Sequence, residues 1–287
     1  MKNFNLFLLT VSLLICSSYS FISFGVVGPF TASAFTCLQS SVPDSIPYVI
    51  IRAYQNSESP SGVDTNALQT ITNSFTAGYA ADIYVEICRG INATSQINLV
   101  NSGVITPMMT NPSVYTNYLV YIKVEPSVNS ACSWEAYTQQ DNCNYLMEAA
   151  NAVSNLGFWT PVVFSTSNIW SKFFGSNCEN MALSTGALLS YADYETTGQV
   201  TSRQTFDDFL PFGGWSVGNG NIYIKQVGGN VTVPLLCSST PWHAFVDQYW
   251  YWLFIAILSS IELINIHNIL IIREPKMIII IKLRSKL

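Results

Sequence analysis

Residues 118–125 read YLVYIKVE, a nearly continuous apolar run that ends at Pro126. A run of this length is typical of a strand that is buried on both faces of a sheet. It is followed by an alanine-bearing amphipathic pattern from Asn144 to Leu156, which Gly157 ends, and by a second apolar run, VVFST, at 162–166. Strand, helix and strand in this order predict a parallel βα unit.

The same pattern extends in both directions along the chain. Further strands are predicted at 48–54, 82–87, 187–194 and 222–227, and a further helix is predicted at 65–77, where Gly78 ends it. We therefore expect an α/β fold over residues 21–250. In this length range an irregular β/α barrel of the TIM type is the leading architecture, and an open doubly wound sheet is the alternative.

Composition excludes several classes of protein. Of the 287 residues, 49% are hydrophobic and only 10% are charged, which excludes a disordered chain. Residues 21–250 contain six Lys and Arg against fifteen Asp and Glu, so this segment lacks the basic excess of a nucleic-acid-binding domain. No glycine-rich phosphate-binding motif follows a predicted strand, and no GxSxG motif is present, so we expect no nucleotide and no cofactor.

Both ends of the chain differ from residues 21–250. Residues 1–20 combine Lys2, an apolar stretch at 6–16 and small residues near position 20, a pattern typical of a cleaved secretory signal. The tail at 251–287 is strongly apolar, is interrupted by polar residues, and contains the run MIIIIK followed by further basic residues. Two interpretations stay open: a transmembrane anchor with a basic end, or a non-native read-through segment with the Ile/Asn/Lys-rich composition of translated A/T-rich DNA.

Cysteine usage agrees with secretion. Six cysteines remain once the signal and its Cys16 are removed, and an even number favours disulfides in an oxidising compartment. None lies in a CxxC or Cys/His cluster, so we expect no metal site. Spacing leaves the pairing open, although Cys132 and Cys143 are close enough to close one loop. The disulfide candidates are Cys37, Cys88, Cys132, Cys143, Cys178 and Cys237, and glycosylation sequons begin at Asn92 and Asn230.

Six segments in chain order carry a resemblance to a known family: FTCL at 35–38, VIIRAY at 49–54, YIKVE at 121–125, LGF at 156–158 with VVFS at 162–165 and Trp170, FDDFLPFGGW at 206–215 with IKQ at 224–226, and VDQYW at 246–250. Together they resemble the secreted lysozymes of glycoside hydrolase family 25, particularly the divergent lysozyme-like proteins of amoebae and nematodes. The resemblance implies an irregular TIM-like barrel with eight strands and fewer helices. It also implies muramidase ancestry, which means cleavage of the β-1,4 bond between N-acetylmuramic acid and N-acetylglucosamine in bacterial peptidoglycan.

The catalytic carboxylates of that family are only partly present. Hydrolysis of a glycosidic bond needs a protonated carboxyl group and an ionised one. Glu125 matches the family's general acid, but Lys123 replaces the Asp of its Asp-x-Glu signature, and residues 24–29 lack the Asp of its first strand. Residues two apart on a strand share a face, so the ammonium of Lys123 favours ionised Glu125 and opposes proton donation. These losses predict weak or absent catalysis.

Other side chains could complete the site. Asp193 and Asp247 are the catalytic candidates that we place beside Glu125, and Asp82 and Glu86 are further carboxylates in predicted strands. The candidate sugar-binding residues are mostly aromatic, and roughly half of the aromatic residues are expected to be ordinary core residues. These candidates are Tyr54, Tyr121, Tyr191, Tyr194, Trp215 and Gln226.

Three functions are consistent with these features. They are a secreted lysozyme-like glycosidase with a role in innate defence, a glycan-binding barrel without hydrolysis, and a membrane-tethered surface protein if the tail is a true span. The expected partner is the bacterial cell-wall glycan, the expected state is a monomer, and the expected location is secreted or the lumen of a lysosome or phagosome. Because cell walls are anionic, an acidic chain gains no electrostatic capture at neutral pH, which predicts better action in an acid vacuole.

Overall fold

The computed structural model describes residues 20–41, 45–56, 61–192, 209–216, 222–233, 242–250, 264–266, 269–274 and 277–282. The chain divides into two compact units: one is Phe21–Tyr249, and the other combines Met1–Ser20 with Trp250–Leu287. Apart from Ser20, the predicted signal lies outside the described residues.

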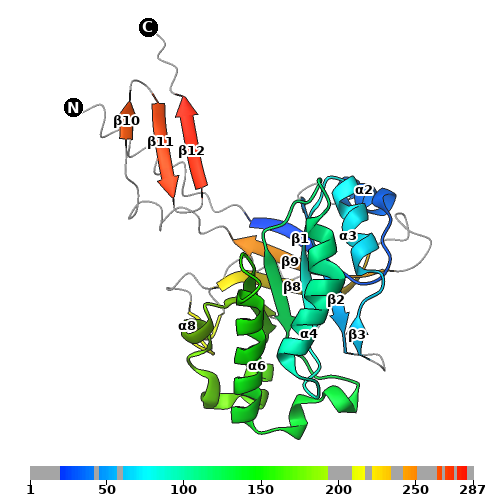
Figure 1. Ribbon diagram of the computed structural model, residues 1–287, viewed down its shortest axis with the longest axis vertical. Coiled ribbons are helices and arrows are strands. Elements are labelled where there is room, and N and C mark those ends of the chain that lie inside the picture. The colour runs from blue at the N-terminus through cyan, green and yellow to red at the C-terminus, as the bar shows by residue number, and fades with distance from the viewer. Residues whose placement is uncertain are drawn as a thin grey trace. The chain divides into compact units, whose positions relative to one another are not determined.

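In the first unit, the described residues form one nine-stranded sheet in the order β1-β9-β8-β7-β6-β5-β4-β2-β3. β1 also pairs with β2, so the sheet curls into an irregular barrel (Figure 1). The strands are β1 Ser20–Val26, β2 Ser45–Gln55, β3 Gly62–Val63, β4 Ala80–Glu86, β5 Leu119–Lys123, β6 Thr160–Ser165, β7 Leu188–Ala192, β8 Ile222–Val233 and β9 Trp242–Trp250.

Strand direction confirms the α/β barrel class and corrects the strand number. From β1 through β2, β4, β5, β6 and β7 to β8, each neighbouring pair is parallel, so the described parallel part has seven strands and not the expected eight. β9 pairs antiparallel with β8. Only residues 234–241 separate these two strands, and a parallel crossover needs a dozen residues or more. The last strand therefore has to return in the opposite direction.

Helices lie in the connections between successive parallel strands from β1 to β7. α4 and α6 lie side by side over the sheet (Figure 1). The side chain of Asn92 accepts a hydrogen bond from the amide of Ser95 at the start of α4, and Thr138 accepts one from Asp141 at the start of α6. The helices are α2 Ala32–Ser41, α3 Ala67–Thr76, α4 Ala93–Val100, the π-helix η1 Asn101–Ile105, α5 Thr106–Met109, the 3-10 turns η2 Ser130–Cys132 and η3 Trp134–Ala136, α6 Gln139–Ser154, α7 Ser167–Phe173, the 3-10 turn η4 Gly175–Cys178, and α8 Met181–Thr185.

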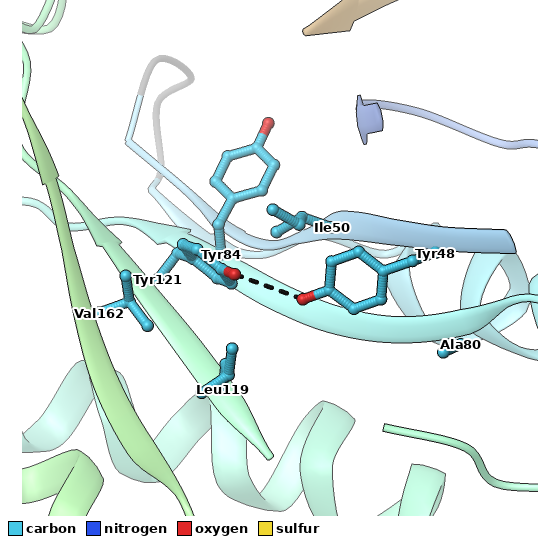
Figure 2. Close-up of a cluster of buried hydrophobic side chains, with 7 residues drawn as sticks. All are labelled: Tyr48, Ile50, Ala80, Tyr84, Leu119, Tyr121 and Val162. Atoms are coloured by element: carbon cyan, nitrogen blue, oxygen red, sulfur yellow. Dashed lines mark hydrogen bonds between the residues drawn. The ribbon is translucent and has the colours of Figure 1, made fainter. Parts of the chain in front are cut away.

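The interior of the barrel is filled by alternate residues of neighbouring strands. Their shared core cluster consists of Tyr48, Ile50, Ala80, Tyr84, Leu119, Tyr121 and Val162 (Figure 2). The hydroxyl groups of Tyr48 and Tyr121 lie 3.3 Å apart within it. Asp82, also buried, accepts hydrogen bonds from Tyr48, from Thr116 and from the amides of Asn117 and Leu119. Asp82 thus ties β4 to the segment that leads into β5.

A second aromatic cluster packs outside this interior. The ring of Trp170 in α7 contacts Phe174, Phe212 and Trp215, and Phe212 in turn contacts Phe209. Trp215 Nε1 donates a hydrogen bond of 2.8 Å to the carbonyl oxygen of Ala187. This outer aromatic cluster joins α7 to the segment 209–216.

The second unit contains a three-stranded antiparallel sheet among its described residues. Its strands are β10 Ile264–Ile266, β11 Ile269–Glu274 and β12 Met277–Lys282. Among the residues that the structure describes, no helix has both the length and the apolar character that a membrane crossing needs. The assignment of residues 251–287 stays a prediction.

Candidate active site

The carboxyl ends of β4 and β5 form the candidate site. β4 ends at Glu86 and β5 ends at Lys123, and these two residues are paired in the ladder between the strands. A cavity of about 140 Å³ lies at this edge of the sheet. It is lined by Asn56, Glu86, Lys123, Glu125, Pro126, Ser127 and Val128.

Lys123 is shared by two carboxylates. Its Nζ lies 3.0 Å from Oε2 of Glu125 and 3.9 Å from Oε1 of Glu86. These two carboxylate oxygens are therefore at most about 7 Å apart, which is compatible with the roughly 5 to 9.5 Å between paired carboxyl groups of glycosidases. The predicted closeness of Lys123 and Glu125 is confirmed.

Glu86 is the more buried of the two carboxylates. Its side chain is 16% exposed, against 31% for Glu125. Nη1 of Arg52 lies 3.8 Å from Glu86 Oε2, and within the described residues this oxygen has no hydrogen-bond partner. Burial raises the pKa of Glu86, while the charges of Lys123 and Arg52 act to lower it and that of Glu125 adds to the rise.

Arg52 and Tyr84 are partners in the ladder between β2 and β4, close to Glu86 in the sheet. Arg52 Nε donates to Oδ2 of Asp64 at 2.8 Å, and its Nη2 donates to Gln55 at 2.8 Å, so the guanidinium is fixed. The Tyr84 side chain points away from the Tyr48–Tyr121 hydrogen bond (Figure 2). Its hydroxyl is buried without a hydrogen-bond partner in the described part of the chain, and burial holds its pKa well above the usual value.

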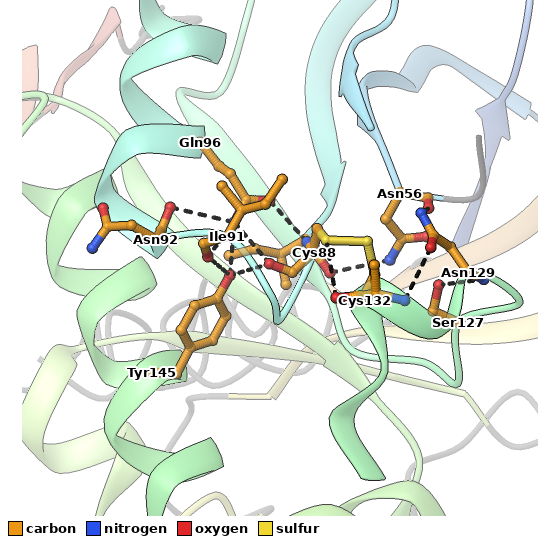
Figure 3. The surroundings of a disulfide bond; sticks show 11 residues. Asn56, Cys88, Ile91, Asn92, Gln96, Ser127, Asn129, Cys132 and Tyr145 are labelled. Atoms are coloured by element: carbon orange, nitrogen blue, oxygen red, sulfur yellow. Dashed lines mark hydrogen bonds between the residues drawn. A yellow bond between two sulfur atoms is a disulfide. The ribbon is translucent and has the colours of Figure 1, made fainter. Parts of the chain in front are cut away.

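A disulfide fixes the rim of the cavity. Cys88, just after β4, is bonded to Cys132 in the segment after β5 (Figure 3). On one side of this bond Asn129 donates to the carbonyl of Asn56 at 3.2 Å, and on the other Gln96 donates to the carbonyl of Cys88 at 2.9 Å. The ends of β2, β4 and β5 are therefore linked.

Comparison with known families decides the relationship. A family model described as "Lysozyme-like protein 1" matches residues 17–226. The chain belongs to this lysozyme-like protein family. The match covers the seven parallel strands up to Gln226 in β8, and with them the whole of the cavity. No curated protein matches the chain significantly.

Solved structures agree on the fold of the lysozyme-like chain. A muramidase from Acremonium alcalophilum is 14% identical with a TM-score of 0.55, and a family GH25 lysozyme from Aspergillus fumigatus is 13% identical with a TM-score of 0.55; each match covers 80% of this chain and 93% of the other. The bacterial lysozyme from Streptomyces coelicolor is 12% identical with a TM-score of 0.51, over 80% of this chain and 92% of that one. The GH25 resemblance is confirmed at the level of the fold.

The first strand of the lysozyme-like barrel offers no carboxylate. β1 ends at Val26, which is fully buried, and the next residue, Val27, packs against the interior core cluster. An apolar residue therefore fills this position. In the described part of the chain, no group of three or more His, Cys, Asp or Glu residues is arranged to hold a metal ion.

Four of the predicted sugar-binding aromatics are packed inside the protein. Tyr54 is 1% exposed, Tyr121 3%, Tyr191 4% and Trp215 1%. Tyr121 belongs to the barrel interior, Tyr191 contacts Phe209, and Trp215 belongs to the outer aromatic cluster. Stacking on a sugar needs an open ring face, so a sugar-binding role for these four residues stays a prediction.

Several other predicted site residues are described only in part or not at all. Asp193, Tyr194 and Cys237 are among the undescribed residues, and for Gln226, Asn230 and Asp247 only the backbone is described. Gln226 pairs with Ala192, the last residue of β7, and also with Asp247 in β9. This register places Gln226 and Asp247 at the carboxyl ends of the parallel strands, the same edge as Glu125. Their roles stay predictions.

The disulfides correct one expectation. Cys132 is bonded to Cys88 and not to Cys143, and Cys143 is bonded to Cys178. Closeness in sequence does not decide this pairing. Cys132 faces the end of β4, whereas Cys143 lies in α6 and faces η4. Cys37 is also disulfide-bonded. At the Asn92 sequon, the side-chain amide of Asn92 donates to Glu148 at 3.0 Å, and glycosylation there stays a prediction.

Proposed function

We propose that this lysozyme-like protein is a glycoside hydrolase that acts on the β-1,4 bonds of bacterial peptidoglycan, between N-acetylmuramic acid and N-acetylglucosamine. The observation that carries the proposal is Glu125: it lines a cavity at the carboxyl edge of a muramidase-type barrel, with a second carboxylate close by. In β/α barrels this edge is where catalytic side chains converge. The disulfide-bonded first unit supports secretion or delivery to a lysosomal or phagosomal lumen, with a role in innate defence.

A second candidate is a glycan-binding barrel without hydrolysis. It is favoured by the ammonium of Lys123, which lies within 4 Å of both carboxylates, at a position where the resemblance to glycoside hydrolase family 25 implies an aspartate. In that case the same cavity would hold cell-wall glycan without cleaving it. We propose that in either case the protein acts as a monomer, and that Asp193 or Asp247 contributes to the site.

The test separates the two candidates with one pair of proteins. Wild type and Glu125→Gln are incubated with purified peptidoglycan between pH 4 and pH 7, and turbidity, released reducing ends and wall-bound protein are measured. Hydrolysis predicts clearing that Glu125→Gln abolishes. The binding candidate predicts wall capture without reducing ends, and little change in Glu125→Gln. If the protein neither binds the walls nor clears them at any pH, both candidates are refuted.

A further inference from the structure

We propose that Glu86 is the second carboxyl group of this site and donates the proton to the glycosidic oxygen, while Glu125, beside Lys123, stabilises the positive charge that develops on the sugar. The inference rests on the proposed function. It assigns to Glu86 the role of general acid, which the family resemblance implies for Glu125.

Geometry selects Glu86 among the carboxylates around the barrel interior. Glu86 lines the cavity together with Glu125, and the ammonium of Lys123 brings their oxygens within about 7 Å of each other. Asp64 is 4% exposed and engaged by Arg52. Asp82 is fully buried, accepts four hydrogen bonds and does not line the cavity. Neither of these is available to a ligand.

The two glutamates differ in how deeply they are buried and in how closely a cation contacts them. The side chain of Glu125 is 31% exposed, against 16% for Glu86, and its Oε2 lies 3.0 Å from Nζ of Lys123. Glu86 Oε2 is buried without a hydrogen bond from any described residue, and its nearest cationic group, Nη1 of Arg52, is 3.8 Å away. A charge on a buried oxygen that accepts no hydrogen bond is costly. The neutral form of Glu86 avoids that cost.

The charged and titratable groups that face Glu86 do not cancel this difference. They are Arg52 from β2, Asp64 after β3, Tyr84 from β4, and Lys123 and Glu125 at the end of β5. Arg52 is directed mainly at Asp64, at 2.8 Å, and lies 3.8 Å from Glu86. Lys123 is likewise closer to Glu125 than to Glu86. Both cations are therefore partly neutralised by other carboxylates, and burial raises the pKa of Glu86.

The proposed step is an ordinary hydrolysis. Glu86 transfers its proton to the glycosidic oxygen as the bond between that oxygen and the sugar carbon C1 breaks. The carboxylate of Glu125 stabilises the positive charge that develops at C1. A water molecule then bonds to C1 through its oxygen and returns one proton to Glu86, so that the enzyme regains its starting state.

Three variants test the inference: Glu86→Gln, Glu86→Asp and, as a matched control, Glu135→Gln. Glu135 is an exposed glutamate that is ion-paired with Lys172 away from the cavity. The rate of reducing-end release from peptidoglycan is measured from pH 3 to pH 8 beside wall binding and thermal unfolding. We expect Glu86→Gln to lower the rate by about 100-fold or more and to remove the fall in rate at high pH, because that fall reports the proton donor. Glu86→Asp should retain both a measurable rate and the fall, and Glu135→Gln should match wild type.

Several results would overturn the inference. One is a folded Glu86→Gln protein that keeps more than a tenth of the rate; another is a fall at high pH that disappears in Glu125→Gln and persists in Glu86→Gln. If Glu86→Gln does not fold, loss of the high-pH fall in Glu86→Asp decides against it. A wild type that binds walls and releases no reducing ends refutes the role of Glu86 but leaves wall binding intact. Absence of both binding and release refutes the proposed function itself.

Discussion

Glu86 and Lys123 end neighbouring strands and are partners in the β4–β5 ladder, and their charged groups approach to 3.9 Å. The resemblance to glycoside hydrolase family 25 implies an aspartate where Lys123 stands. The substitution leaves the cavity with one ammonium between two carboxylates. The pH dependence of any activity should therefore be sensitive to this lysine.

Replacing Lys123 with Met should move the fall in activity to higher pH. The charge of Lys123 acts to lower the pKa of Glu86, so its removal raises that pKa further and keeps the proton donor loaded at higher pH. We expect a shift of about one pH unit. The measurement is the pH profile of reducing-end release, with Lys172→Met, at the exposed Lys172–Glu135 pair, as the control. A shift toward lower pH would contradict this account.

The stability of the fold should also depend on Glu86. Because burial raises its pKa in the folded state above that of the unfolded chain, its favourable contribution is complete below the unfolded value, near 4.3, and is lost as the pH rises through the folded value. The free energy of unfolding, measured by denaturant titration at several pH values from 4 to 7, should decline more steeply with pH in wild type than in Glu86→Gln. Equal slopes would show that Glu86 titrates alike in both states.

Trp215 should matter for stability and not for glycan binding. Trp215→Phe removes the hydrogen bond from Nε1 to Ala187 and leaves a void in the outer aromatic cluster, which should lower the free energy of unfolding by about 1 to 3 kcal/mol. Wall binding by the folded variant should equal that of wild type. The exposed Phe158 provides a control, since Phe158→Ala should leave stability nearly unchanged. Weaker binding by folded Trp215→Phe would restore Trp215 as a sugar-binding residue.

Gly90 should tolerate no side chain. A Cβ at this position would overlap the carbonyl oxygen of Ala131, a backbone atom next to the Cys88–Cys132 bond. We expect Gly90→Ala to lower the free energy of unfolding by about 1 to 3 kcal/mol and to weaken wall binding, because the rim has to shift. Gly62→Ala, where a Cβ meets no atom within 4 Å, is the matched control. Thermal unfolding and pull-down with peptidoglycan provide both readouts, and a Gly90→Ala protein as stable as the control would argue against a rigid rim.

The strands and helices around the site were predictable because their apolar patterns are local. The run at 118–125 contains β5, Leu119–Lys123, and the predicted strand at 82–87 overlaps β4, Ala80–Glu86. The helix predicted from Asn144 to Leu156 begins five residues earlier, at Gln139. Its first turn is polar and is set by the capping contact of Thr138 with the amide of Asp141, which leaves no hydrophobic period to read.

The composition of the site depended on contacts that no local pattern encodes. From the sequence, Glu86 could not be distinguished from other carboxylates in predicted strands. The register between β4 and β5 shows that it lies opposite Lys123. Asp64 and Tyr84 gave no signal, since one follows a two-residue strand and the other is one of many tyrosines in apolar runs. The burial of Tyr121 and Tyr191 was equally hidden, because strands covered on both faces do not reveal which ring reaches an open surface.

The two described disulfides also determine how the folded protein would respond to a protease. Cys88–Cys132 spans the site rim, and Cys143–Cys178 follows it along the chain. A single backbone cleavage between residues 89 and 131, or between 144 and 177, leaves both pieces covalently joined. In a compartment full of digestive enzymes, a nicked molecule could therefore keep its cavity, and the fragments would separate on a gel only after the sulfur bonds are reduced.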